Sequence, residues 1–142
     1  MTLRIGFDLV DVPRFRAFLT RRGGRALTRL FTPHERAVAQ GRAERLAARF
    51  AAKEAVAKAL GTGLGAVGWL EIEVRTGPHG APQVHLSGRA AARARALGLF
   101  AWSISLTHTD QCAGAVVIGW GLVTSNTTTE TFASISRDLD HD

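Results

Sequence analysis

Apolar and polar residues alternate at the start of the chain and then change to a helical spacing. Every second position from Leu3 to Leu9 is apolar, which predicts a half-buried strand with Asp8 on the opposite face. Pro13 suits the first turn of a helix, and Arg14–Arg22 carries apolar residues at helical spacing. Gly23-Gly24 then breaks the pattern. The first part of the chain is therefore predicted to run from a strand into a helix.

The central part of the chain is predicted to be helical. A short helix passes through Leu27 and Leu30, and Thr32 then caps a further helix with Glu35 placed to complete a capping box. The longest helix should run from about Ala43 to Leu60. The remaining predicted elements are strands at Leu70–Val74, Gln83–Leu86, Ala101–Thr109 and Ala113–Trp120, and a helix from Ser87 to Leu97. This order predicts an α+β fold in which a small antiparallel sheet packs with one long and several short helices.

The length of 142 residues suits one domain, which we place at residues 1–120. The Ser/Thr-rich, acidic segment 121–142 has no periodicity and is predicted to be a disordered tail. No run of 18 apolar residues is present, and Asp8 and Asp11 interrupt the early apolar stretch. A single cysteine allows no internal disulfide. We therefore expect a cytoplasmic protein that does not enter a membrane.

The net charge of +6 is unevenly distributed, because the acidic tail offsets a domain of about +9. Such a surface favours an acidic partner: nucleic acid, an acidic protein or a phosphorylated small molecule. Arginines cluster between Arg14 and Arg25, whereas aromatic residues for base stacking are few and tyrosine is absent. A docking surface for an acidic protein fits this pattern better. A basic nucleic-acid-binding module without catalysis is the alternative.

Both lysines of this arginine-rich chain lie in one short segment, which suggests a role that a planar guanidinium does not fill. Glu54 precedes Lys58 by one helical turn, so the two charges share a helix face. Glu54 also falls on the apolar stripe predicted to face inward, where a carboxylate must be paired or coordinated. A functional carboxylate and a simple Glu54–Lys58 helix pair are both open at this point.

Three further positions have two interpretations each. Asp8 is either a solvated strand residue or, with Glu54, the second carboxylate of a hard-cation site. His108 is in phase with the apolar residues of its strand, so it is either a core histidine or a phosphate contact. The glycines from Gly61 to Gly65 follow a helix rather than opening one, which favours a helix stop over a phosphate-binding loop.

Four segments together resemble a known family. Gly6–Arg14, Phe31–Glu35, Arg49–Gly63 and Ser105–Thr109 are similar, in the same order, to the motifs of holo-[acyl-carrier-protein] synthases. The resemblance spans nearly all of Met1–Trp120, and its central motif is specific. It implies transfer of 4′-phosphopantetheine from coenzyme A to a serine of apo acyl carrier protein, with release of adenosine 3′,5′-bisphosphate.

The resemblance also implies roles for individual residues. Asp8 and Glu54 match magnesium ligands, and Lys58 matches the lysine that contacts the reacting phosphate; these three are the predicted catalytic residues. The predicted coenzyme A contacts are Arg49, Lys53, Lys58, Gly61, Thr107 and His108. The predicted contacts to the acidic carrier protein are Arg14, Arg21 and Arg25. Val10 stands where larger relatives have a further acid, which favours the small type, a homotrimer with its sites at subunit interfaces.

Overall fold

The computed structural model describes residues 1–63 and 65–122 of the chain, and it has the predicted α+β fold. The strands are β1 (Thr2–Asp11), β2 (Ile72–Thr76), β3 (Pro82–Leu86), β4 (Ala101–His108) and β5 (Cys112–Gly121). The helices are α1 (Val12–Arg22), α2 (Gly24–Leu30), α3 (Pro33–Ala39), α4 (Ala43–Ala59) and α5 (Gly88–Ala96). Short 3₁₀ turns at Trp69–Glu71 and Pro78–Gly80 precede β2 and β3.

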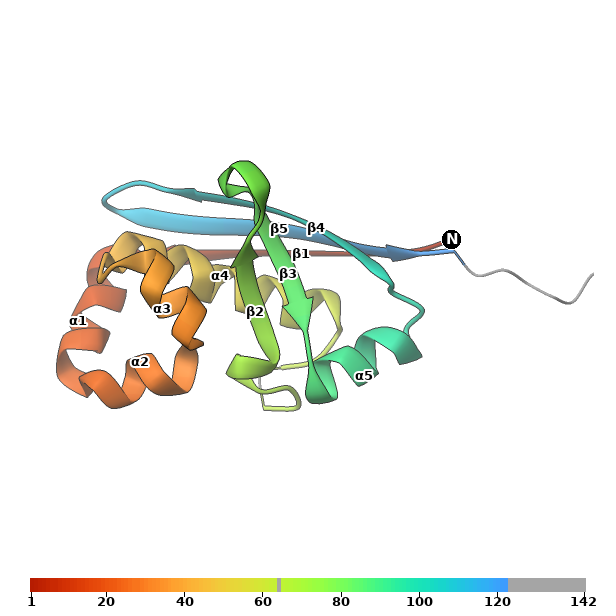
Figure 1. The fold of residues 1–142 in the computed structure, drawn as a ribbon, viewed down its shortest axis with the longest axis horizontal. Coiled ribbons are helices and arrows are strands. Elements are labelled where there is room, and N and C mark those ends of the chain that lie inside the picture. The colour runs from red at the N-terminus through yellow and green to blue at the C-terminus, as the bar shows by residue number, and fades with distance from the viewer. Residues whose placement is uncertain (64, 123–142) are drawn as a thin grey trace, which may run out of the picture.

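The strands form two antiparallel sheets. The larger has the order β1-β5-β4, and the smaller is the β2-β3 hairpin. The helices all lie on one side of the larger sheet, with α4 beneath β1 and β5 (Figure 1). Within the larger sheet Phe7 is paired with Val116 and Asp8 with Ala115. The sheet therefore presents one face to α4 and leaves the other uncovered by the described residues.

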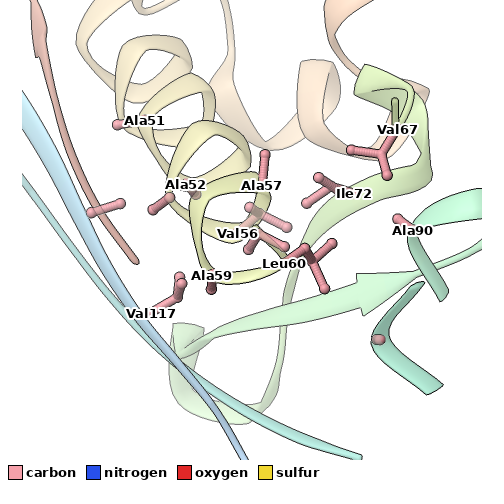
Figure 2. Close-up of a cluster of buried hydrophobic side chains, with 14 of the residues drawn as sticks. Ala51, Ala52, Val56, Ala57, Ala59, Leu60, Val67, Ile72, Ala90 and Val117 are labelled. Carbon is pink, nitrogen blue, oxygen red and sulfur yellow. The ribbon is translucent and has the colours of Figure 1, made fainter. Parts of the chain in front are cut away.

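Helix α4 approaches the sheet closely because small residues line the contact. A Cβ atom added to Gly6 would overlap the carbonyl oxygen of Ala55, so glycine is required at that point of β1. Alanines make up much of the buried surface of α4, and Figure 2 shows them packed with larger aliphatic side chains from the surrounding elements. This contact sets the position of α4 beside β1.

The prediction for β1 was correct about the strand and wrong about which face is buried. The four apolar side chains of its alternating pattern are exposed, by 55% for Leu3, 63% for Ile5, 57% for Phe7 and 59% for Leu9. The opposite face, which carries Gly6, packs on α4 because only a surface of small residues permits such close approach. The apolar face of β1 is therefore left without a partner among the described residues of the monomer.

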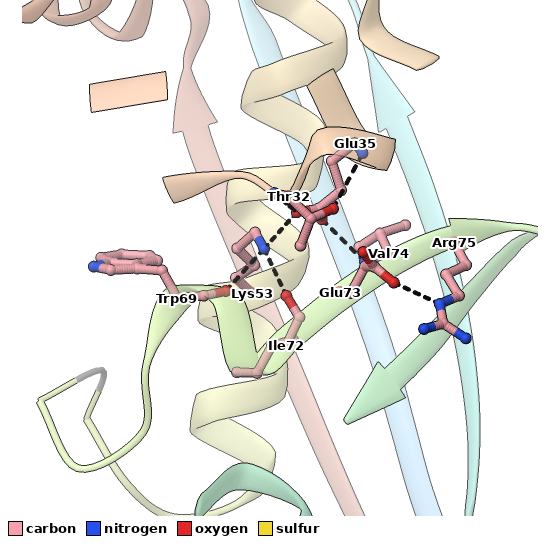
Figure 3. Close-up of polar contacts among 8 residues, drawn as sticks. All are labelled: Thr32, Glu35, Lys53, Trp69, Ile72, Glu73, Val74 and Arg75. Atoms are coloured by element: carbon pink, nitrogen blue, oxygen red, sulfur yellow. Dashed lines mark hydrogen bonds and ion pairs between the residues drawn. The ribbon is translucent and has the colours of Figure 1, made fainter. Parts of the chain in front are cut away.

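A buried ion pair joins α4 to α3 and to the start of β2. The Lys53 ammonium donates to Glu35 Oε1 at 2.8 Å and to the carbonyl oxygens of Trp69 at 2.9 Å and Ile72 at 2.5 Å. Both side chains are fully buried. The remaining oxygen of Glu35 accepts from the Val74 amide at 3.0 Å (Figure 3). All three ammonium protons can thus be satisfied, which a buried charge requires.

The same carboxylate also caps α3. Glu35 Oε1 accepts from the Thr32 amide at 2.9 Å, and Thr32 Oγ1 accepts from the Glu35 amide at 3.2 Å, which is the predicted capping box. Glu54, which the apolar spacing placed on the inward stripe of α4, is half-buried beside β1. The fully buried charge of α4 is Lys53, because α3 and β2 cover its side of the helix.

Two other predictions concern the end of the chain and its surroundings. The predicted tail lies almost wholly at 123–142, outside the described residues, although Gly121 belongs to β5. Across the described part of the chain, no helix combines the length and apolar character needed to cross a membrane. The cytoplasmic location stays a prediction.

The two lysines allow a matched test of the buried ion pair. Lys53→Met should lower the free energy of unfolding by about 3–5 kcal/mol, because it leaves the Glu35 carboxylate buried without its counter-ion. Lys58→Met, the same change at a 55% exposed side chain, should cost no more than about 1 kcal/mol. The double variant Lys53→Met, Glu35→Gln should lose less than the sum of the single variants. Urea unfolding measures all of these, and a Lys53→Met loss equal to that of Lys58→Met would contradict the role assigned to the pair.

Candidate active site

Asp8, Glu54 and Lys58 come together where β1 crosses α4. The Lys58 ammonium donates to Asp8 Oδ1 at 2.9 Å and to the Phe7 carbonyl oxygen at 3.0 Å. Glu54 lies one turn earlier on α4, and it lines the same hollow as Asp8. Because Gly6 lets the strand sit so close to the helix, residues about fifty positions apart reach one another. The juxtaposition of these three residues thus depends on the contact between β1 and α4.

The two carboxylates of this cluster repel each other. Burial, and then the negative charge of Asp8, raise the pKa of Glu54, and Lys58 opposes the effect. One ammonium offsets only one of the two negative charges. A divalent cation would relieve the remaining repulsion, and Mg²⁺ is often held by one or two carboxylates together with water and substrate oxygens. The donor set of Asp8 and Glu54 therefore fits magnesium.

No group of three or more histidine, cysteine, aspartate or glutamate side chains suited to a metal occurs in the part of the chain that the structure describes. A cation held by Asp8 and Glu54 would thus need water or substrate to complete its shell. That requirement matches the way magnesium is held in phosphoryl-transfer sites, where phosphate oxygens supply several ligands.

The hollow beside this cluster, which we call the carboxylate hollow, has a volume of about 560 Å³. It is lined by Asp8, Leu9, Val10, Asp11, Arg14, Phe15, Phe18, Arg21, Phe50 and Glu54. Asp11 caps α1 by accepting from the Arg14 amide at 2.8 Å, and this cap starts the helix directly after β1. The carboxylates and the arginines Arg14 and Arg21 therefore share one surface.

A second hollow, the arginine–histidine hollow, lies between α4, β4 and the β2-β3 hairpin and has a volume of about 390 Å³. Its lining includes Arg45, Arg49, Ser105 and His108. Burial is the largest cause of a lowered pKa at Arg49; Glu35 opposes it, and the positive charge of Arg45 lowers it further. The buried Nε atom of Arg49 has no hydrogen-bond partner among the described residues. An anion in this hollow would offset the two like charges of Arg45 and Arg49.

The structure does not place every predicted residue at these two hollows. Lys53 is fully buried and its ammonium is engaged with protein oxygens, so the prediction that it contacts coenzyme A does not fit its position. Gly61 (φ +70°) and Thr107 are exposed but line neither hollow, and Arg25 lies apart on α2. Gly61 follows the last turn of α4, which agrees with the predicted helix stop.

Sequence reasoning missed several residues of the site. Arg45 precedes Arg49 by one helical turn, and this spacing could have placed both on one face of α4. Nothing in the sequence singled out Ser105 as a site residue, apart from its place in the segment Ser105–Thr109 that is similar to a family motif. His108, which had two interpretations, is exposed and lines the arginine–histidine hollow, so the core interpretation does not hold.

Comparison with known proteins settles the family. The family model of the 4′-phosphopantetheinyl transferase superfamily matches residues 4–116. The chain belongs to this superfamily. It is 48% identical over 124 residues to a holo-[acyl-carrier-protein] synthase from Desulforudis audaxviator, which covers 85% of this chain and 95% of that protein. It is 51% identical over 114 residues to one from Frankia casuarinae, covering 80% of this chain and 93% of that protein.

Solved structures of the superfamily share the fold. Holo-[acyl-carrier-protein] synthase from Helicobacter pylori, solved in complex with coenzyme A, has a TM-score of 0.75 and 29% identity, covering 82% of this chain and 99% of that one. The enzyme from Neisseria meningitidis has a TM-score of 0.75 and 30% identity, covering 82% and 97%. The family resemblance and the α+β fold predicted from the sequence are thereby confirmed.

The raised pKa of Glu54 leads to a prediction for the metal-free transferase. Glu54→Gln should increase its stability by about 0.5–1 kcal/mol near pH 7, because the amide avoids a partly buried charge beside Asp8. The folded state binds the Glu54 proton more tightly than the unfolded state does. The stability this contributes is complete below about pH 4.5 and is lost as the pH rises through the folded-state pKa.

The advantage of the variant should therefore grow as the pH is raised from about 4 to 7. Urea unfolding in EDTA at several pH values measures it, and Glu44→Gln, the same change in the first turn of α4, is the matched control. A Glu54→Gln variant less stable than the wild type near pH 7 would show that the charged form stabilises the fold.

Proposed function

We propose that this protein transfers the 4′-phosphopantetheine group of coenzyme A to a serine of apo acyl carrier protein and releases adenosine 3′,5′-bisphosphate. The observation that carries the proposal is the meeting of Asp8, Glu54 and Lys58 beside a hollow lined by Arg14 and Arg21. Membership of the 4′-phosphopantetheinyl transferase superfamily and the similarity to named holo-[acyl-carrier-protein] synthases support it.

Asp8 and Glu54 would hold Mg²⁺, whose charge would neutralise the coenzyme A diphosphate during transfer. Their two carboxylates are fixed by separate elements, β1 and α4, so their spacing depends on packing rather than on a flexible loop. Repulsion between the two carboxylates makes it unfavourable for both to be ionised in the absence of a cation, as the raised pKa of Glu54 indicates. This supports a role in binding a substrate together with its metal.

Lys58 is suited to contact the phosphate that is transferred. Its ammonium is already directed at Asp8, yet 55% of its side chain is exposed, so it can reach a group bound in front of the carboxylates. A compact ammonium on a flexible stem can follow charge as it moves from the attacking serine oxygen to the leaving group. The nucleophile comes from the carrier protein, so the site needs no serine of its own.

The arginine–histidine hollow is suited to the nucleotide end of coenzyme A. Arg45, Arg49 and His108 offer cationic or hydrogen-bonding groups to phosphate. The related structures solved with coenzyme A support a coenzyme site in this fold. Arg14 and Arg21, at the other side of α4, would meet acidic residues of the carrier.

Transfer is tested by incubating the protein with coenzyme A, Mg²⁺ and an apo acyl carrier protein and measuring the intact mass of the carrier. The carrier should gain the mass of phosphopantetheine, and EDTA should abolish the gain. Glu54→Gln should lower the rate by about 100-fold or more, because it removes charge that holds the metal at the transferred group. Glu44→Gln on the same helix should retain the wild-type rate. No mass gain with any of several carriers would refute the proposal.

We further propose that the protein is a homotrimer whose subunits meet through the uncovered face of the β1-β5-β4 sheet. Large apolar side chains occupy this face from both β1 and β5, including Ile5, Phe7 and the 36% exposed Val116. A contiguous apolar face of this kind is uncommon on a monomer and is typical of a subunit interface. A closed ring of identical subunits would cover it in every copy.

Ile5→Asp should convert the trimer to monomers, because a carboxylate would be buried at the interface without a partner. Size-exclusion chromatography with light scattering measures the change. Leu70→Asp, at a 47% exposed leucine on the 3₁₀ turn before β2, should leave the trimer intact. A wild-type protein that elutes as a monomer at micromolar concentration would contradict the proposed assembly.

A further inference from the structure

Lys58 lies in the last turn of α4, at the end of the helix where backbone carbonyl groups point outward. The aligned peptide dipoles place about half a negative charge at this end of a helix. The phosphate sites that helices form by themselves are at the opposite end, where amides and the positive end of the dipole attract the anion. A phosphate that approaches Lys58 is therefore opposed by the helix that carries this lysine.

The backbone satisfies two of the carbonyl groups at this end. The Gly61 amide donates to the Lys58 carbonyl oxygen at 3.0 Å, and the Thr62 amide donates to the Ala57 carbonyl oxygen at 3.1 Å. These two bonds form a Schellman motif, in which Gly61 takes a left-handed conformation with φ +70°. The backbone of the last turn, and with it the base of the Lys58 side chain, is thus fixed.

Two arginines from other elements converge on the same end of the helix. Arg93, on α5, donates from Nε to the Leu60 carbonyl oxygen at 3.1 Å. Arg4 lies on the face of β1 that also carries Gly6 and packs on α4. A Cβ atom added to Gly61 would lie 3.3 Å from Nη1 of Arg4 and 3.8 Å from Nη2 of Arg93. Both guanidinium groups thus lie beside Gly61, and we call this pair the arginine cap.

The charges of the arginine cap are not neutralised by carboxylates within residues 1–63 and 65–122. Neither Arg4 nor Arg93 forms an ion pair there. The one described hydrogen bond of Arg93 is to a carbonyl oxygen, which carries no net charge. Two positive charges therefore face a partial negative charge of about half a unit at the helix end. The resulting potential beside Lys58 is positive.

We propose that the arginine cap reverses the negative potential at the end of α4, so that the coenzyme A diphosphate can lie against Lys58. The inference rests on the proposed function, which brings the transferred phosphate to Lys58. Arg4 and Arg93 are positioning residues, since they act on the phosphate through the potential at the helix end. Both lie outside the four segments that resemble family motifs, so the cap is a feature of this chain that those motifs do not specify.

Titration calorimetry with coenzyme A and Mg²⁺ tests the cap without a carrier protein. Arg4→Gln and Arg93→Gln should each raise the Kd for coenzyme A about two- to fivefold at low salt, the range expected for one charge at a helix end. The difference from the wild type should shrink as salt increases. Arg95→Gln is the matched control, because Arg95 is also exposed on α5 but two residues from Arg93 and so on another face. An effect of Arg95→Gln equal to that of Arg93→Gln would reduce the cap to general surface charge and overturn the proposal.

Arg93→Lys separates the charge of the side chain from its shape. Lysine keeps the positive charge and loses the planar guanidinium group, so the Kd for coenzyme A should stay within about twofold of the wild-type value. A loss of affinity as large as that of Arg93→Gln would show that charge is not the cause, and the electrostatic role would be refuted.

Urea unfolding gives a readout that needs no ligand. Arg93→Gln should lower the urea midpoint, because it removes a cation from the negative end of α4. Arg42→Gln makes the same change at the exposed N-cap of this helix, where a cation faces the positive end of the dipole. This variant should have an unchanged or higher midpoint. Equal losses in the two variants would contradict an effect of the helix dipole and overturn the proposal.

Kinetics distinguish failure of the cap from failure of the proposed function. The diphosphate is charged before and during transfer, so loss of the cap should raise the Michaelis constant for coenzyme A and leave kcat unchanged. If the wild type modifies the carrier and both Arg4→Gln and Arg93→Gln have wild-type constants, the reaction stands and the cap is refuted. If the wild type neither binds coenzyme A nor modifies any carrier, the proposed transfer is wrong and the inference that rests on it is overturned as well.

Discussion

The Lys53 ammonium lies in the interior of the protein, and it can remain charged there only because Glu35 and two backbone carbonyl oxygens surround it. Through these contacts α4 is tied to the cap of α3 and to the entry of β2. Burial lowers the pKa of Lys53 even though Glu35 acts to raise it, because the loss of hydration of the ammonium outweighs the attraction of the carboxylate. Helix α4 has little freedom to shift while this pair is intact, and both hollows that flank it depend on its position.

Two consecutive residues of α4 consequently face opposite environments, one the protein interior and the other a surface hollow. Lys53 points into the interior, whereas Glu54 faces the hollow beside β1, and Lys58 follows one turn later at the surface. The close packing of the helix on Gly6 brings Asp8 to the same place. A rigid buried pair thus supports a neighbouring site whose own charges are not balanced. Imbalance of this kind is expected where binding a cation and a phosphate is the task.

The surface of the protein is specialised in two ways. One face of the larger sheet is apolar and is not covered by any segment that the structure describes, and the corner between α1 and α2 brings arginines together beside aromatic side chains. These features suit different kinds of partner, because an apolar face favours another copy of the chain and a cationic one favours an acidic protein. The carboxylates Asp8 and Glu54 lie next to α1, which bears Arg14 and Arg21, so the acidic and basic groups of the carboxylate hollow are held together by α1, β1 and α4.

The sequence by itself determined the elements and most of their ends, because caps, glycines and apolar spacing act over a few residues. The capping box at Thr32 and the stop at Gly61 are examples, and the matching motifs identified Asp8, Glu54 and Lys58 together. Only the tertiary structure decided which faces are buried. Leu3 to Leu9 alternate as a buried strand would, yet α4 packs on the opposite face because Gly6 allows it. Likewise, Lys53 is buried because α3 and β2 pack against α4. Arg45 lines the arginine–histidine hollow because β4 lies near α4. The spacing of residues along the chain cannot specify how these elements approach one another.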